Sequence, residues 1–513
     1  MRRSFATTSA IGAVGLAGWL SGAVPAQAGM PVLGVRAGGD ASIVHNVADQ
    51  GISIVRMPPR VGLVTPPRDD KDKVVPSKQV TPALGRVLRI AARIGNQPTD
   101  GLKGWLGVHM EPVELPLALS VGLSDGNGAL ILGVTAGGPA AQAGVRFGDI
   151  VVGMNGKAVA GMNDLRQRVM AATPGSEALL EVWRVGTEDT DFLATLRRLA
   201  DEGNAHAMYR LGRLYAFGNG VLKNDVTAVQ WYRKGADAGN SSAMTALAFA
   251  LLEGRGTGVN QQEGLRWLRD GANAGNVDAM NRLGHILLDG TIADKDPLEA
   301  ARLFKKAAEA EHVASMVDLA RLYYNGIGIQ TDINMAAVWY KRASDLGNSV
   351  AMVTLGWMHE NGKGVDTDPF MAADLYRRAA DLGNSGGMVN LALLHVQGKG
   401  VARNEAAAVA LYRKAIGLGN PMAMNNLAWM LQEGRGVDRK DPEEAAELMM
   451  KALDRKLEFS RQRMTQYWKS WSREFRMALQ RRLQAAGHYN GRVDGNFRES
   501  TVTAINAYFN RPR

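Results

Sequence analysis

One serine of this chain sits among glycines, in a pattern that resembles the surroundings of a catalytic serine. The stretch Gly383-Asn384-Ser385-Gly386-Gly387 would offer Ser385 as a nucleophile, but such a serine needs a partnered His and Asp to move its proton. No such pair stands at a recognisable spacing. Ser385 instead falls in register with a repeated Gly-Asn pair, and Gly387 occupies the position of Ala351 and Ala423 in other copies. We therefore predict a structural serine and no catalytic residue.

A row of methionines is the second set of side chains that could do chemistry. It comprises Met208, Met244, Met280, Met316, Met352, Met388 and Met424. Thioethers can bind copper(I), but only where several sulfurs lie close together. These recur once every 36 residues, which favours a buried packing column. The chain has no Cys, which excludes thiolate sites and disulfides. We predict no metal site and no cofactor.

The same period positions many other residues from Gly203 to Met424. Six of the seven copies begin with Gly-Asn, and the fourth has Glu311-His312 instead. Leu, Gly, small-residue and aromatic columns keep the register, and Asp296-Pro297 and Asp368-Pro369 are typical helix starts. Each copy therefore predicts two helices around a Gly-rich turn. Units of this size must stack on neighbours to bury their apolar faces, and the stack offers a groove to a protein partner.

These columns resemble the Sel-one-like repeat family, which is related to tetratricopeptide repeats. The resemblance implies an all-α solenoid of about seven helix-pair repeats over residues 190–453. Residues 192–200 would form a half-repeat that caps its N-terminal end.

Residues 101–187 have a different pattern. Short apolar runs at 104–108, 129–134 and 179–185 predict strands, and 163–172 predicts a short helix with Leu165 and Val169 on one face. The sequence of residues 137–156 is G-G-P-A-A-Q-A-G-V-R-F-G-D-I-V-V-G-M-N-G. This stretch resembles a bacterial PDZ domain of the HtrA type, which implies an α+β domain.

The PDZ resemblance implies that an extended peptide adds as a further strand to an exposed sheet edge. Trp105-Leu106-Gly107-Val108 matches the family's carboxylate-binding loop, whose N–H groups point at a terminal carboxylate. Gly107 permits close approach because it has no Cβ. Leu106, Val108, Leu165 and Val169 would line the pocket for the last side chain, and ordinary core packing is the alternative for these four residues.

The sequence of the C-terminal residues 479–497 is L-Q-R-R-L-Q-A-A-G-H-Y-N-G-R-V-D-G-N-F, and an apolar helix follows. This resembles the small peptidoglycan-binding-like domain, an all-α module placed here at 473–513. Arg498-Glu499 stands where the family usually has Gly-Pro, and Asn510 where it has Gln. These departures affect the expected sugar-peptide contact more than the fold. Tyr489, Asn490 and Arg492 are the predicted peptidoglycan contacts, as exposed polar groups on a loop.

The N-terminus has the pattern of an export signal. Arg2 and Arg3 precede an apolar run at 11–24, and Ala26-Gln27-Ala28 is a cleavage site. The run is too short and Gly-rich for a transmembrane anchor, and both ordinary and twin-arginine export remain open. We predict a signal peptide over 1–28, cleaved after Ala28, and a periplasmic protein. Residues 29–100 lack a sustained period, which predicts a flexible linker with one helix around 84–94.

The net charge of +10 is concentrated near the C-terminus, where residues 454–513 hold 13 Lys/Arg against 5 Asp/Glu, a local +8. In an exported protein such a segment would attract anionic envelope polymer rather than nucleic acid. A solvated basic helix face is the alternative.

Together these patterns predict a multidomain, non-catalytic scaffold. Its PDZ domain would bind extended or C-terminal peptides of envelope proteins, its repeats a second protein, and its C-terminal domain peptidoglycan. An adaptor or regulator of an envelope protease is the first alternative. A wall-active or degenerate enzyme is the second, although about 72 residues between signal and PDZ segment are too few for a two-barrel protease.

Overall fold

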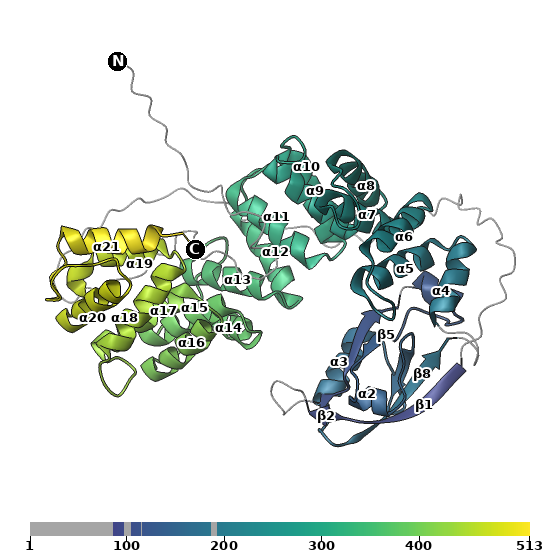
Figure 1. Cartoon of the computed structure of the whole chain (residues 1–513), viewed down its shortest axis with the longest axis horizontal. Helices are drawn as coiled ribbons and strands as arrows, with labels where there is room; N and C mark the ends of the chain where they lie inside the picture. Colours follow the sequence, from purple (N-terminus) through teal and green to yellow (C-terminus); the bar gives the residue numbers. More distant parts are fainter. Residues whose placement is uncertain (1–85, 97–103, 114, 186–191, 513) are drawn as a thin grey trace, which may run out of the picture.

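The computed structural model describes residues 86–96, 104–113, 115–185 and 192–512. In this part of the chain a sheet-containing unit, a helical solenoid and a small helical module follow one another (Figure 1). The solenoid forms an arch with the sheet unit at one end and the C-terminal module at the other. This confirms the predicted multidomain fold class. The predicted signal peptide and most of the predicted linker lie outside the described residues.

The sheet unit is antiparallel throughout. Its main sheet has the order β1-β8-β6-β5-β4, with β7 paired to β6, while β2 and β3 form a separate ribbon. The strands are β1 Arg86–Arg93, β2 Gly95–Asn96, β3 Gly104–Trp105, β4 Val108–Pro112, β5 Ala129–Val134, β6 Ile150–Met154, β7 Lys157–Ala158 and β8 Glu177–Arg184. Three helices lie between strands: α1 Leu115–Ser120, α2 Pro139–Gln142 and α3 Met162–Ala171.

Strand β1 corrects an expectation from the sequence. The helix predicted around residues 84–94 is wrong, because Arg86–Arg93 pair antiparallel with β8 over the whole strand. Val87 on β1 is 56% exposed and Ala92 is buried. This edge strand is therefore held by its hydrogen bonds to β8 as well as by burial of its apolar side chains. The sheet therefore begins inside the segment assigned to the linker, before residue 101.

The solenoid begins with α4 (Phe192–Asp201), which shares one apolar core with the sheet unit and with α5. Fourteen helices of 13 residues then form seven successive pairs. They are α5 Ala205–Phe217, α6 Asp225–Asp237, α7 Ser241–Glu253, α8 Gln261–Asn273, α9 Val277–Asp289, α10 Pro297–Glu309, α11 Val313–Asn325, α12 Ile333–Asp345, α13 Ser349–Asn361, α14 Pro369–Asp381, α15 Ser385–Gln397, α16 Glu405–Gly417, α17 Pro421–Glu433 and α18 Pro442–Asp454.

The Gly-Asn anchor joins successive repeats. Each anchor Asn caps the first helix of its own repeat, as where Asn420 Oδ1 accepts from the Ala423 N–H at 3.1 Å. The Nδ2 of Asn240, Asn276, Asn384 and Asn420 also meets a side chain of the preceding repeat, as where Asn420 donates to Ser385 Oγ at 3.1 Å. In the fourth repeat His312 replaces the Asn: its Nδ1 accepts from the Ser315 N–H, and its Nε2 lies 3.4 Å from Asp278. The anchor residues therefore cap helices and link neighbouring repeats.

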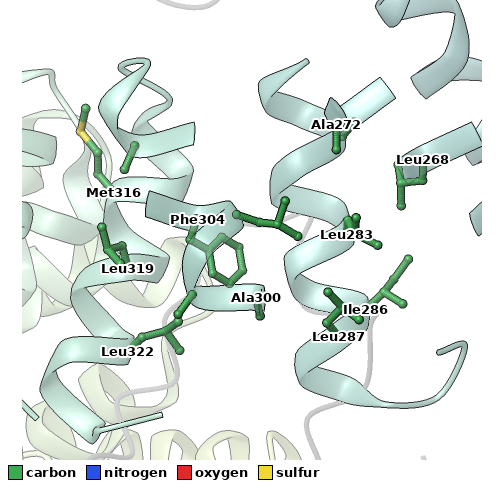
Figure 2. Close-up of a cluster of buried hydrophobic side chains, with 14 of the residues drawn as sticks. Leu268, Ala272, Leu283, Ile286, Leu287, Ala300, Phe304, Met316, Leu319 and Leu322 are labelled. Carbon is green, nitrogen blue, oxygen red and sulfur yellow. The ribbon is translucent and has the colours of Figure 1, made fainter. Parts of the chain in front are cut away.

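The periodic columns form the solenoid core. Figure 2 shows Phe304 of α10 between Leu283 of α9 and Leu319 of α11. Each repeat has Gly or Ala at the position of Gly284 in α9. Here the small residue makes room for the aromatic ring, since a Cβ on Gly284 would lie 2.8 Å from the Phe304 ring. Four of the seven column methionines are buried (Met316, Met352, Met388 and Met424), and the other three are half-buried. Their packing agrees with the structural interpretation of this row.

The C-terminal module is packed against the last repeat. It comprises α19 Glu458–Thr465, a 3-10 turn η1 Trp468–Ser470, α20 Arg473–Ala485 and α21 Glu499–Asn510. Trp471 stacks on Phe475 with centroids 4.2 Å apart and meets Trp429 of α17 edge-on at 5.3 Å. Asp454 at the end of α18 accepts from the Tyr508 hydroxyl at 2.5 Å. The module and the last repeats therefore share one core.

Candidate binding surfaces

The predicted carboxylate loop connects β3 to β4. Two of its carbonyl groups are hydrogen-bonded to the rest of the domain. Leu106 O accepts from the Ala140 N–H of α2 at 2.9 Å, and Gly107 O accepts from the Thr135 N–H after β5 at 2.8 Å. In a trans peptide the N–H points opposite to the C=O. The N–H groups of Gly107 and Val108 are therefore directed away from α2 and β5. This is the orientation that a carboxylate-binding loop needs.

Glycines let this loop take its shape. Gly107 has a φ of +73°, which a residue with a Cβ adopts only with strain. A Cβ on Gly107 would also lie 3.0 Å from the Trp105 ring. Gly104 was not among the predicted site residues, yet a Cβ there would lie 2.0 Å from the carbonyl oxygen of Val169. Gly104 thus holds the loop against the last turn of α3.

The four predicted pocket residues come together. Leu106, Leu165 and Val169 are buried and Val108 is half-buried, all in a single apolar cluster between the sheet and α3. Trp105 is half-buried at the start of the loop. A role in holding the last side chain of a ligand stays a prediction for these residues, because the same cluster is also the core of the domain.

The edge strand β4 pairs with β5 alone in the described part of the sheet. Its outer edge lies on the side of the carboxylate loop and of α3, so it can accept an added strand. Val108 and Met110 pack toward the core under α3. Glu111 has the opposite orientation and is buried against α5, where its carboxylate forms ion pairs with Arg210 and Arg213.

The contact between Glu111 and the first repeat was not anticipated from the sequence. Arg210 is 2% exposed and Glu111 is 7% exposed. Arg210 Nη2 also donates to the carbonyl oxygen of Pro112 at 2.8 Å. The edge strand and the solenoid are thereby joined by charge-assisted hydrogen bonds as well as by the apolar core around α4.

The predicted peptidoglycan contacts divide into two groups. Asn490 and Arg492 are exposed on the loop after α20, as expected. The expectation of an exposed Tyr489 is wrong: it is 3% exposed, and its hydroxyl donates to the Arg492 carbonyl at 2.9 Å. Tyr489 therefore supports the loop from within. A direct contact through Asn490 and Arg492 stays a prediction.

Buried Gln480 organises this loop. Its Oε1 accepts from the Gly495 N–H at 2.8 Å, and its Nε2 donates to the Asn496 carbonyl at 3.1 Å and to the Tyr489 hydroxyl at 3.3 Å. Hydrogen bonding to Arg498 lowers the pKa of Asp494 to about 2, so this loop carboxylate is ionised at neutral pH. Gln480 and the Asp494-Gly495 turn therefore shape this loop through their hydrogen bonds.

Within the described ranges, no group of three or more His, Asp or Glu side chains is placed to hold a metal ion. None of the helices in the described part of the chain is both long and apolar enough to cross a bilayer. Ser385 is the first residue of α15, where its hydroxyl belongs to the Asn420 bridge between repeats.

Comparison with protein families matches three models in the predicted order. A PDZ domain matches residues 104–192, seven consecutive Sel1 repeats (the Sel-one-like family) match residues 205–456, and a peptidoglycan-binding type of domain matches residues 472–508. The chain is thus a multidomain protein with a PDZ domain, a Sel1-repeat solenoid and a peptidoglycan-binding-type domain.

Relatives match this chain in parts. A DegP-like periplasmic serine endoprotease of Rhizobium meliloti is 40% identical over 114 residues, 21% of this chain and 23% of the relative. A Brucella suis protein of the same description is 40% identical over 109 residues, 20% of this chain and 21% of the relative. The chain therefore spans less than a quarter of these curated relatives.

Two solved structures are similar to the solenoid. A Sel1 repeat protein from Oxalobacter formigenes is 26% identical, with a TM-score of 0.46 over 54% of this chain and 80% of that one. A protective antigen of uropathogenic Escherichia coli with an SLR fold is 24% identical, with a TM-score of 0.42 over 62% and 79%.

Proposed function

We propose that this protein is an exported, non-catalytic scaffold that captures peptide ends and holds them at the peptidoglycan of the periplasm. The observation that carries this proposal is the succession of binding modules in one chain, each packed against the next. The PDZ similarity to periplasmic proteins and the export signal pattern support the location. The solenoid between the two ends would dock a second protein.

An exposed leucine row supports protein docking on the solenoid. Leu346, Leu382 and Leu418 directly follow the second helices of three successive repeats and are 49%, 58% and 57% exposed. The first three repeats have Ala238, Ala274 and Ala310 at this position. Exposed apolar side chains at the same position of successive repeats are typical of a protein-binding face.

Changing Gly107 to Val should abolish peptide capture. A side chain at this position is strained at φ +73° and stands where the terminal carboxylate must approach. We expect the Kd for a C-terminal peptide, measured by fluorescence anisotropy, to rise on the order of tenfold or more. Gly156→Val is the matched control, because Gly156 has a φ of +74° with open space around it. Equal affinities for the two variants would refute the loop assignment.

Changing both Asn490 and Arg492 to Ala should weaken binding to purified peptidoglycan sacculi without unfolding the module. Both side chains are exposed, whereas truncating the module would uncover the shared core around Trp471. We expect a severalfold smaller fraction to pellet with sacculi at moderate salt. Arg377→Ala serves as the control for a lost surface charge, since Arg377 lies on the solenoid. Unchanged pelleting of the double variant would place the contact elsewhere. Pelleting of the native chain that disappears when salt is raised would mean a purely charge-driven association, without a specific contact.

An adaptor of an envelope protease is the second candidate. The similarity of the PDZ segment to DegP-like periplasmic serine endoproteases favours it. Affinity purification from periplasmic extract should then recover a protease with the native chain but not with Gly107→Val. Recovery that is equal for both would separate protease binding from peptide capture.

A further inference from the structure

The outward-facing backbone groups of β4 can be assigned from its register. The carbonyl oxygen of Gly107 accepts from the Thr135 N–H, so the backbone groups of Gly107 face β5. Because backbone groups alternate along an antiparallel pair, the N–H and C=O of Val108 face away from β5, although its side chain packs toward the core. An added strand would meet the N–H and C=O of Val108 first, directly after the carboxylate loop.

The register of β4 and β5 shifts at a β-bulge between His109 and Met110, and the pairing beyond it gives the other outward residues. The Ile131 N–H bonds to the carbonyl oxygen of Asp149, directly before β6, so the backbone groups of its neighbour Leu130 face β4. Leu130 pairs with Glu111, whose backbone therefore faces β5. Met110 and Pro112, on either side of Glu111, face outward. The outer edge thus consists of Val108, Met110 and Pro112.

The last position of this edge is already occupied. Pro112 has no N–H to offer, and its carbonyl accepts from Arg210 Nη2 at 2.8 Å. Arg210 is held there by its buried ion pair with Glu111. A side chain of the first Sel1 repeat therefore takes the hydrogen bond that a longer peptide strand would make with Pro112.

We propose that Arg210 ends the peptide-binding edge, so that the PDZ domain pairs only with the last few residues of its ligand. A peptide whose carboxylate lies at the 105–108 loop runs antiparallel to β4. Its last residue then pairs with Val108 and its third-from-last residue with Met110, while its fifth-from-last residue meets the Arg210–Pro112 contact. Upstream residues leave the sheet beside α5. This inference rests on peptide capture by the PDZ domain.

Backbone N-methylation of a bound peptide tests the proposal. The probe is the tightest binder selected from a random peptide library with free C-terminal carboxylates. Methylating the last or the third-from-last amide should each weaken binding about threefold to tenfold, the loss of one hydrogen bond. Methylating the fifth-from-last amide should change the Kd less than about twofold. A penalty at the fifth-from-last amide equal to the other two would overturn the proposal and leave peptide capture intact.

In a double variant without Arg210, methylation of the fifth-from-last amide should weaken binding. Glu111→Met/Arg210→Met replaces the buried pair with apolar side chains of similar volume and frees the Pro112 carbonyl. The fifth-from-last amide should then show a penalty of about threefold or more. The matched control Arg233→Met/Glu263→Met removes an ion pair between α6 and α8 and should keep the native pattern. An unchanged pattern in a folded double variant would overturn the role of Arg210. A library without any binder would overturn peptide capture itself, and this proposal with it.

Discussion

Replacing Gly400 with Ala should destabilise the solenoid by about 2–5 kcal/mol, a sum of backbone strain and overpacking. Gly400 has a φ of +67°, and a Cβ there would lie 1.9 Å from the carbonyl oxygen of Pro369. The corresponding glycines of other repeats make the same approach to the preceding repeat (Gly256, Gly328, Gly364 and Gly436). The turn glycine therefore sets how closely neighbouring repeats stack.

Gly383→Ala separates the two contributions. Gly383 has a φ of +81° but no atom within 4 Å of an added Cβ, so only backbone strain of about 1–2 kcal/mol is expected. Hydrogen exchange across α14–α16, together with urea unfolding, measures the difference, because repeat arrays open locally. Equal losses of stability for the two variants would contradict the close stacking at Gly400.

Replacing Glu111 with Ala should destabilise the junction between the PDZ domain and the solenoid by about 3–5 kcal/mol. The change leaves the buried guanidinium of Arg210 without its carboxylate. Hydrogen exchange should increase in β4 and α5 and remain native in the distant helices α15–α18. Unfolding followed by urea titration gives the free-energy change.

The double variant Glu111→Met/Arg210→Met is the control for this loss. Removing both buried charges leaves only Arg213 without its carboxylate, and this side chain is 30% exposed to solvent, so most of the lost stability should return. A single variant as stable as the native chain would mean that the ion pair contributes nothing to the junction. A double variant as unstable as the single one would assign the loss to packing and not to charge.

The solenoid was predictable because its signal is repeated. A column such as Leu283, Leu319 and Leu355 occupies the same buried position in each copy, so periodicity alone predicts the fold. The capping role of the anchor Asn was missed in the sequence, although the preference of Asn for helix N-caps could have suggested it. Its second bond, to the preceding repeat, depends on stacking geometry that spacing does not reveal.

Other features depended on contacts that local patterns do not contain. The segment Arg86–Arg93 contains Ala, Leu and Arg, which favour helix, yet pairing with β8 makes it a strand. Tyr489 looked like an exposed loop residue, but buried Gln480 gives its hydroxyl a partner inside the module. Glu111 and Arg210 are 99 residues apart, and nothing in either neighbourhood indicates that they meet.

The central claim is that one chain links a peptide end to the wall, and a bridging assay tests it most directly. A fluorescent C-terminal peptide, purified sacculi and the mature chain are mixed at moderate salt, and the peptide in the pellet is measured. We predict that peptide pellets only when the chain is present, and that Gly107→Val and the Asn490→Ala/Arg492→Ala pair each reduce the pelleted peptide severalfold or more. Peptide that stays in solution while the chain binds sacculi or peptide separately would contradict the scaffold account.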